Sequence, residues 1–263
     1  MSKATASEVI LSAQGLVVIG ARGPGTRVWY RPTGTTRLHE HTLKFEPPRE
    51  SPAALMPGGR LLVVGRNGEA ILIEAGRTPQ PVPALGNGVV EGLSPDLVAF
   101  CRGPHFYRLV EGKWRDESPE QGEAQRGVGA VGGYAVGAEG DCWVPDPKGW
   151  KRTKLKTTAT LTCAQGEWAG GPGVVVQRLA KSFKLHPVKG TVTAVCPWGK
   201  SALVLVDGTL RELSGAPVKA PPRITSVSAH GDALAVISNG SLLERTGPRE
   251  RWERRSLPKL ARK

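Results

Sequence analysis

The chain has 263 residues and carries 36 lysine and arginine residues against 23 aspartate and glutamate residues, which gives a formal net charge of +13. This length allows one large all-β domain or two smaller ones with a substantial core, and the positive charge favours an acidic partner or a polyanion. Four isolated cysteines, at Cys101, Cys142, Cys163 and Cys196, form no metal-binding spacing and are interpreted as small buried hydrophobic residues. No apolar run reaches the length of a signal peptide or a membrane span, so a cytoplasmic location without membrane contact is expected.

A repeated unit runs through the chain and is clearest from Ile224 to Gly247, where three apolar runs each end in a polar turn. Asn239-Gly240 between two such runs is a strong hairpin signal, because both central residues of a type I′ turn need a positive φ. The turn after the first run recurs at Gly15, Gly59, Asp96, Gly133, Gly166, Gly199 and Gly231. Successive spacings are 44, 37, 37, 33, 33 and 32 residues. We therefore predict seven units, at about 7–51, 52–88, 89–126, 127–158, 159–190, 191–223 and 224–258, within one domain that ends in a basic tail at 259–263.

Each unit continues with a second apolar run, a turn and a third run, which predicts a hairpin in every unit. In chain order these turns fall at 21–23, 66–68, 102–104, 138–140, 172–173, 207–208 and 238–240. A fourth, more polar run closes each unit and has the charge expected of an outer edge strand. It carries an aromatic residue in four units, at Trp114, Trp150, Phe183 and Trp252.

First runs are rich in small residues, second runs are apolar and fourth runs are charged, and this gradient resembles the repeats of β-propeller proteins. The units look like WD40-type repeats without their Gly-His and Trp-Asp pairs, over residues 7 to 258. The resemblance implies an all-β, seven-bladed β-propeller of four-stranded antiparallel blades. A six-bladed propeller is the alternative, if Gly127–Gly133 is a loop. We expect the ring to close by contact between the first and last blades, without exchange of a strand.

Residues for chemistry are few. GARGPGTR at Gly20–Arg27 lacks the Gly-Lys-Ser/Thr ending of a phosphate-binding loop, and the glycine-rich Gly127–Gly137 precedes a strand instead of a helix. His39 and His41 are two apart and share one face of a strand, but no third ligand follows, so a solvated pair is favoured over a metal site. We predict no catalytic residue, no metal and no cofactor.

Basic residues recur at equivalent positions of the units. In propellers of this kind the turn between the second and third strands and the loop into each first strand lie on one ligand-binding face. Three arginines occupy the turns and three further cations precede first strands: Arg22, Arg66, Arg102, Arg126, Lys189 and Arg223. Such an arc would bind carboxylates or phosphates, although exposed turns also take basic residues for solubility alone.

A second basic cluster lies on the fourth runs. It contains Trp150 with Lys148, Lys151, Lys154 and Lys156, and Trp252 with the tail from Arg249 to Lys263. Interleaved aromatic and basic residues are typical of nucleic-acid binding, yet packing of these tryptophans between blades is the favoured interpretation.

The leading hypothesis is a non-catalytic, monomeric scaffold that presents a basic face to an acidic protein, for example as an immunity-type inhibitor of a toxin. A nucleic-acid-binding propeller is the first alternative. The second is an enzyme or lectin that uses the central channel, with Gln14, Asp96, Gln165 and His230 at the ends of first strands.

Overall fold

The computed structural model describes residues 5–22, 25–47, 53–86, 89–94, 96–101, 105–119, 128–131, 133–216, 218–247 and 250–257. Over these residues the chain forms 25 β-strands and two 3-10 helices, Pro57–Gly59 and Ala138–Gly140, and no α-helix. Within the same residues no helix has the length and apolar character needed to span a membrane. Tail residues 259–263 lie outside the described part of the chain.

The strands form six antiparallel sheets, five with four strands and one with five. The first sheet holds β1 (Thr5–Ser12), β2 (Gly15–Arg22), β3 (Gly25–Pro32) and β4 (His39–Thr42). The second holds β5 (Ala53–Leu55), β6 (Leu61–Val64), β7 (Ala70–Ile73) and β8 (Gln80–Val82). The third holds β9 (Val90–Leu93), β10 (Val98–Cys101), β11 (His105–Val110) and β12 (Lys113–Asp116).

The remaining sheets complete the circle. The fourth holds β13 (Val128–Val131), β14 (Ala135–Gly137), β15 (Asp141–Asp146) and β16 (Gly149–Lys154). The five-stranded sheet holds β17 (Cys163–Gln165), β18 (Trp168–Arg178), β19 (Phe183–Trp198), β20 (Ser201–Val206) and β21 (Thr209–Glu212). The last holds β22 (Ile224–His230), β23 (Ala233–Ser238), β24 (Ser241–Arg245) and β25 (Glu253–Arg255).

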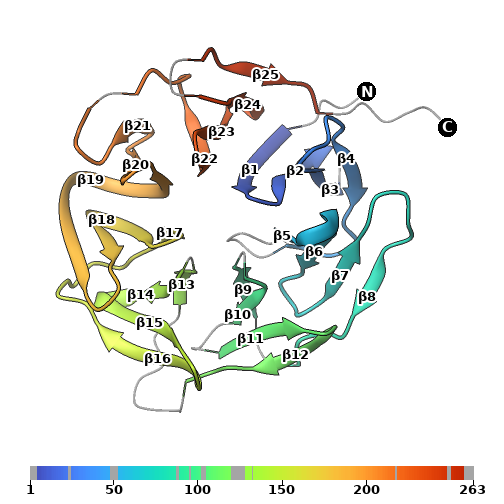
Figure 1. Cartoon of the computed structure of the whole chain (residues 1–263), viewed down its shortest axis with the longest axis horizontal. Helices are drawn as coiled ribbons and strands as arrows, with labels where there is room; N and C mark the ends of the chain where they lie inside the picture. Colours follow the sequence, from blue (N-terminus) through green and yellow to red (C-terminus); the bar gives the residue numbers. More distant parts are fainter. Residues whose placement is uncertain are drawn as a thin grey trace.

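The sheets follow one another around a common centre, with the first strand of each lying innermost (Figure 1). The chain is therefore an all-β propeller of antiparallel blades, as predicted. The predicted number of blades is wrong, because six sheets form where seven separate four-stranded ones were expected. The six-bladed alternative predicts the right number of sheets. Its condition is not met, because it required Gly127–Gly133 to be a loop and part of this segment forms strand β13 in a four-stranded sheet.

The number of sheets differs from the number of predicted units because β19 belongs to two of those units. Residues 183–191 of β19 pair with β18, and residues 192–198 pair with β20. The predicted boundary at 190/191 thus lies inside a continuous strand. Gly190 has a φ of 105°, and a Cβ at this position would collide with the Asp207 carboxylate. A residue without a side chain lets the strand turn from one unit into the next without ending.

The hairpin predicted at Pro172-Gly173 is present, and it lies within β18 (Trp168–Arg178). The backbone N–H of Arg178 donates to the carbonyl of Glu167 at 2.8 Å, so the two halves of β18 run antiparallel to each other. The first half pairs with β17 and the second half with β19, and Gly173 supplies the positive φ of the turn, at 76°. Asn239 and Gly240 have φ angles of 48° and 67° and close the β23–β24 hairpin, as predicted.

Apolar side chains fill the spaces between consecutive sheets. Between the third and fourth sheets, for example, Val98 and Phe100 pack with Ala135 and Trp143. A further cluster lies inside the five-stranded sheet, between the β18 part and the β20 part, where Trp168 packs with Val192. Each sheet is therefore covered on both faces, which accounts for second strands that are apolar at nearly every position.

The aromatic residues of the fourth runs pack against the preceding blade, as predicted. The indole Nε1 of Trp114 donates to the carbonyl of Pro83 at 2.7 Å, and that of Trp252 donates to Lys219 at 2.9 Å. In the other two units the contact is between rings. Trp150 stacks on Phe106 with ring centroids 4.5 Å apart, and Phe183 lies 5.5 Å from Tyr134.

All four cysteines are buried and free of disulfides, as predicted. Burial raises the pKa of the Cys101, Cys142 and Cys196 thiols to about 12. These thiols therefore stay protonated near neutral pH and act as packing groups.

The ring closes by lateral contact between the first and last sheets, each built from its own end of the chain. The backbone N–H of Leu11 donates to Ser228 Oγ at 2.9 Å. Arg31 of β3 donates to both carboxylate oxygens of Glu244 in β24, at 3.1 and 2.5 Å, and Arg255 Nε donates to the same carboxylate at 3.1 Å. One largely buried carboxylate thus joins the two ends of the ring.

Substitution Glu244→Gln is expected to lower the free energy of unfolding by about 2 kcal/mol, because it leaves two neighbouring guanidinium groups without their shared carboxylate. Urea unfolding followed by tryptophan fluorescence measures the change. The matched control is Glu253→Gln, which removes a mostly exposed partner of Arg255 and should change stability by less than about 0.5 kcal/mol. Equal losses in the two variants would contradict this role for Glu244.

Candidate functional site

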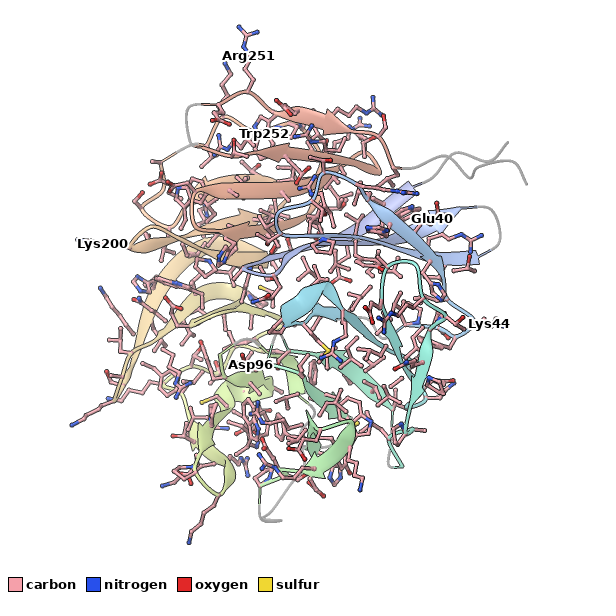
Figure 2. All side chains as sticks on the ribbon, turned by 45° about the vertical axis from the view of Figure 1, so that its right-hand side comes forward. Glu40, Lys44, Asp96, Lys200, Arg251 and Trp252 are labelled. Carbon is pink, nitrogen blue, oxygen red and sulfur yellow. The ribbon has the colours of Figure 1, made fainter. Side chains whose placement is uncertain are left out.

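The strand order gives the ring two distinct ends. At one end lie the turns between second and third strands and the segments that lead into the next first strand, such as 43–47 and 218–223. We call this the connection face. At the other end lie the turns between first and second strands and between third and fourth strands, which we call the opposite face. In Figure 2, Lys44, from the connection face, and Lys200, from the opposite face, lie on opposite sides of the ring.

Three of the six predicted cations are described together with their side chains. The side chain of Arg22, at the end of β2, and the whole of Arg102 and Arg126 lie outside the described residues. Arg66, Lys189 and Arg223 are described, and the strand order places all three on the connection face. Their role in binding a partner stays a prediction.

Arg66 is fixed by its backbone. Its N–H donates to the carbonyl of Glu46, and its own carbonyl accepts from the N–H of Val90, both at 2.8 Å. Its guanidinium lies 3.6 Å from the Glu46 carboxylate, and 36% of its side chain remains exposed. At this exposure the ion pair is weak, so Arg66 remains accessible to a stronger anionic partner.

Lys189 and Arg223 are more open. Both are exposed, and neither makes an ion pair within the described part of the chain. Arg223 has a φ of 53° at the start of β22, and Arg211 donates to the carbonyl of Lys189 at 3.0 Å. These two positions therefore carry charge that the described chain does not neutralise.

In the second predicted basic cluster, Trp150 is buried and Trp252 is half-buried. Trp150 is buried against Phe106, and Trp252 is covered by Arg245, whose guanidinium carbon lies 4.9 Å from the indole centroid. Arg251 extends outward beside Trp252 (Figure 2). Lys154 donates to the buried carboxylate of Asp141 at 2.9 Å. Basic residues are thus present on the outer strands, but the aromatic faces needed for base stacking are occupied.

His39 and His41 lie on β4, close to an aromatic ring and to several positive charges. The His39 ring is 5.2 Å from that of Tyr30. Burial lowers the pKa of both histidines, and nearby positive charges lower it further, Arg37 beside His39 and Arg27 with Lys44 beside His41. Cations on these neighbouring positions oppose binding of a metal ion, which leaves the pair as part of the outer strand.

The four polar residues predicted at the ends of first strands have different hydrogen-bond partners. Gln165 donates from Nε2 to Ser228 Oγ at 3.0 Å and to the Ala229 carbonyl at 3.2 Å, so its amide crosses from β17 to β22. His230 instead lines a cleft between the first and last sheets. The backbone carbonyls of Gln14 and Asp96 accept hydrogen bonds from their own sheets.

Buried ion pairs account for part of the positive charge, and local sequence patterns did not reveal them. Asp141 is fully buried and accepts from Arg152 and Lys154 at 3.0 and 2.9 Å. Burial alone would raise the pKa of this carboxyl, but the hydrogen bonds from Lys154 and Arg152 lower it below its usual value. The pKa of Glu117 is lowered in the same way, against burial, by Arg108 and Arg115.

Neither a protein-family model nor a curated protein sequence matches this chain. The similar solved structures include propeller proteins, namely virginiamycin B lyase and YCF48. Virginiamycin B lyase from Staphylococcus aureus has a TM-score of 0.68 and 9% identity, over 91% of this chain and 94% of that one. YCF48 bound to D1 peptide has a TM-score of 0.63 and 15% identity, over 92% of each chain. PorZ of Porphyromonas gingivalis has a TM-score of 0.56 and 10% identity, over 99% of this chain and 39% of that one. These likenesses support the propeller class and no particular family within it.

Asp141 makes stability depend on pH in a defined direction. Because its folded pKa is lowered, its stabilising contribution is fully present above the unfolded pKa of about 4 and is lost as the pH falls through the folded value. Asp141→Asn should therefore unfold more easily than the wild type at pH 7, and the difference should shrink below about pH 4. Urea midpoints measured from pH 7 to pH 2 test this. Asp232→Asn, in an exposed turn, serves as the control and should follow the wild type throughout.

Proposed function

We propose that this chain is a non-catalytic binding protein that holds an acidic protein partner against its connection face. The observation that carries the proposal is the placement of exposed Lys189 and Arg223 with half-exposed Arg66 on a single end of a rigid ring. Guanidinium groups bind carboxylates through paired hydrogen bonds, and a ring of sheets keeps their spacing constant. A toxin neutralised by this chain is one partner of this kind.

The propeller fold is compatible with such a scaffold. YCF48, a propeller of similar size, was solved with a bound D1 peptide, which supports the idea that a ring of this shape can present a surface to a polypeptide. Virginiamycin B lyase shares the fold at 9% identity, and a fold shared at that level carries no activity with it.

Nucleic acid is the less favoured partner. Stacking of bases on aromatic side chains contributes strongly to single-strand binding, and Trp150 and Trp252 have their faces covered by Phe106 and Arg245. What remains on the outer strands is charge without a stacking surface.

A triple variant, Arg66→Glu with Lys189→Glu and Arg223→Glu, tests the connection face. The probe is a fluorescein-labelled poly-glutamate peptide, and fluorescence anisotropy at about 0.15 M salt, where the Debye length is about 8 Å, gives its dissociation constant. We expect the variant to bind at least about tenfold more weakly than the wild type, because attraction at three positions becomes repulsion.

The matched control makes the same change in charge on the opposite face, at three exposed lysines: Lys113→Glu, Lys148→Glu and Lys200→Glu. The control should keep binding within about twofold of the wild type, because these charges lie at the far end of the ring and are screened by salt. If both variants lose affinity equally, net charge alone drives binding and the site assignment fails. If a single-stranded oligonucleotide binds more tightly than the peptide and shows the same variant pattern, nucleic acid replaces protein as the partner.

A further inference from the structure

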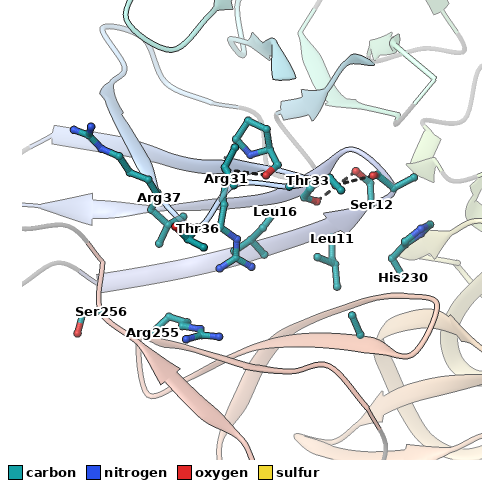
Figure 3. Close-up of a pocket in the computed structure, with 17 residues that line it drawn as sticks. Leu11, Ser12, Leu16, Arg31, Thr33, Thr36, Arg37, His230, Arg255 and Ser256 are labelled. Atoms are coloured by element: carbon teal, nitrogen blue, oxygen red, sulfur yellow. Dashed lines mark hydrogen bonds between the residues drawn. The ribbon is translucent and has the colours of Figure 1, made fainter. Parts of the chain in front are cut away.

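A cleft of about 820 Å³ opens on the opposite face, where the first and last sheets meet. One wall comes from the end of β3 and the loop at 33–38, and the other from β23 and β25, with His230 at one end (Figure 3). The volume lies within the usual range of 300–1,000 Å³ for ligand sites, as an approximate guide.

The charged groups of this cleft are all basic. Arg31, Arg37 and Arg255 line it, and its described lining contains no aspartate or glutamate. Arg31 and Arg255 extend from opposite walls toward the same space (Figure 3). Both bind Glu244, yet a guanidinium has five N–H donors and each arginine retains donors beyond those bonds. The exposed Glu253, which pairs with Arg255, does not line the cleft.

The walls are held in place before any ligand arrives. The N–H and hydroxyl of Thr33 donate to the carbonyls of Gln14 and Ala13, at 2.9 and 2.8 Å. The Thr35 hydroxyl donates to the Pro32 carbonyl at 2.9 Å. Glu244 fixes the two arginines of the opposite walls. A preorganised site of this kind loses little conformational entropy on binding.

Apolar groups accompany the arginines. Leu11 and Leu38 are half-buried and line the cleft beside the fully buried Leu16, with Ala233 across from them. In an extended peptide, alternate side chains point to opposite sides. A segment in which acidic and apolar residues alternate would thus place carboxylates on Arg31 and Arg255 and aliphatic groups on the leucines.

From this match of charge and shape we propose that the cleft is a second binding site, which takes an extended peptide segment of alternating acidic and apolar residues. The site is separate from the connection-face cations, because none of Arg66, Lys189 and Arg223 lines it. Its occupant is defined by carboxylates at the arginines and by aliphatic side chains over Leu11 and Leu38.

The test uses a fluorescein-labelled peptide of sequence Glu-Leu-Glu-Leu-Glu and the same peptide with glutamine in place of glutamate, measured by fluorescence anisotropy against the full chain. The acidic peptide should bind at least about tenfold more tightly than the glutamine peptide. Arg255→Gln should weaken binding about tenfold, because a charged donor is lost while Glu244 keeps its two bonds to Arg31. Ala233→Trp should abolish binding by filling the cleft without changing its charge.

Arg254→Gln is the matched control, because it removes the same charge from the adjacent position of β25 but does not line the cleft. It should bind within about twofold of the wild type.

Arg37→Gln, at an exposed position, provides a second cleft variant should Ala233→Trp fail to fold, and it too should weaken binding. The proposal is overturned if Arg254→Gln loses as much affinity as Arg255→Gln, if a folded Ala233→Trp binds like the wild type, or if the glutamine peptide binds equally well. The connection-face triple variant should bind this peptide normally, so failure of either site is distinguishable from failure of the other.

Discussion

Closure of the ring is the constraint on which the rest of the structure depends. Every sheet is apolar on both faces, so a neighbouring sheet must cover each face. One face of the first sheet and one face of the last can be covered only by each other. Trp29 and Val18 of the first sheet pack with Ile237 and Leu242 of the last. The Glu244 carboxylate and the Ser228 hydroxyl fix the relative position of the two sheets through hydrogen bonds that an apolar contact alone would not specify. With this contact made, each blade is held between two others, and the turns at both ends of the ring have fixed positions.

Most of the fold could be predicted from the sequence because its information is local. Alternating runs, closed by turns such as Asn239-Gly240 and Asp207-Gly208, specify strands and hairpins without reference to the rest of the chain. The number of sheets could not be predicted in this way. Gly173 and Gly190 both have a positive φ, at 76° and 105°, but they act differently. Gly173 closes a hairpin in which Arg178 donates to the Glu167 carbonyl, whereas β19 continues through Gly190 and is only bent there. Whether a glycine ends a strand or bends it is decided by the partner strands, which the local sequence does not contain.

The candidate sites also differ in whether local sequence could reveal them. Equivalent positions in the repeated units predict a common face for Arg66, Lys189 and Arg223, and the strand order places all three there. The cleft could not be found from the sequence, because Arg31 and Glu244 are 213 positions apart and meet only when the ring closes. Gln165 was interpreted as a channel residue from its place at the end of a first strand, and that place is right. Its side chain spans to Ser228, because small residues crowd the axis and leave a half-buried amide within reach of a hydroxyl.

The net charge of +13 therefore has two parts that differ in physical role. Arg108, Arg152 and Arg31 bind carboxylates that are buried or nearly so, and their charge is neutralised within the fold. Cations such as Lys189 and Arg223 make no such pairs within the described chain and contribute to the field outside it. At physiological salt this field decays over about 8 Å, so only charges held close together act on the same partner. A rigid ring supplies that proximity at fixed spacing, and a partner with carboxylates at matching positions would gain from several pairs at once. The specificity of such a surface rests on the geometry of the blades more than on the total charge.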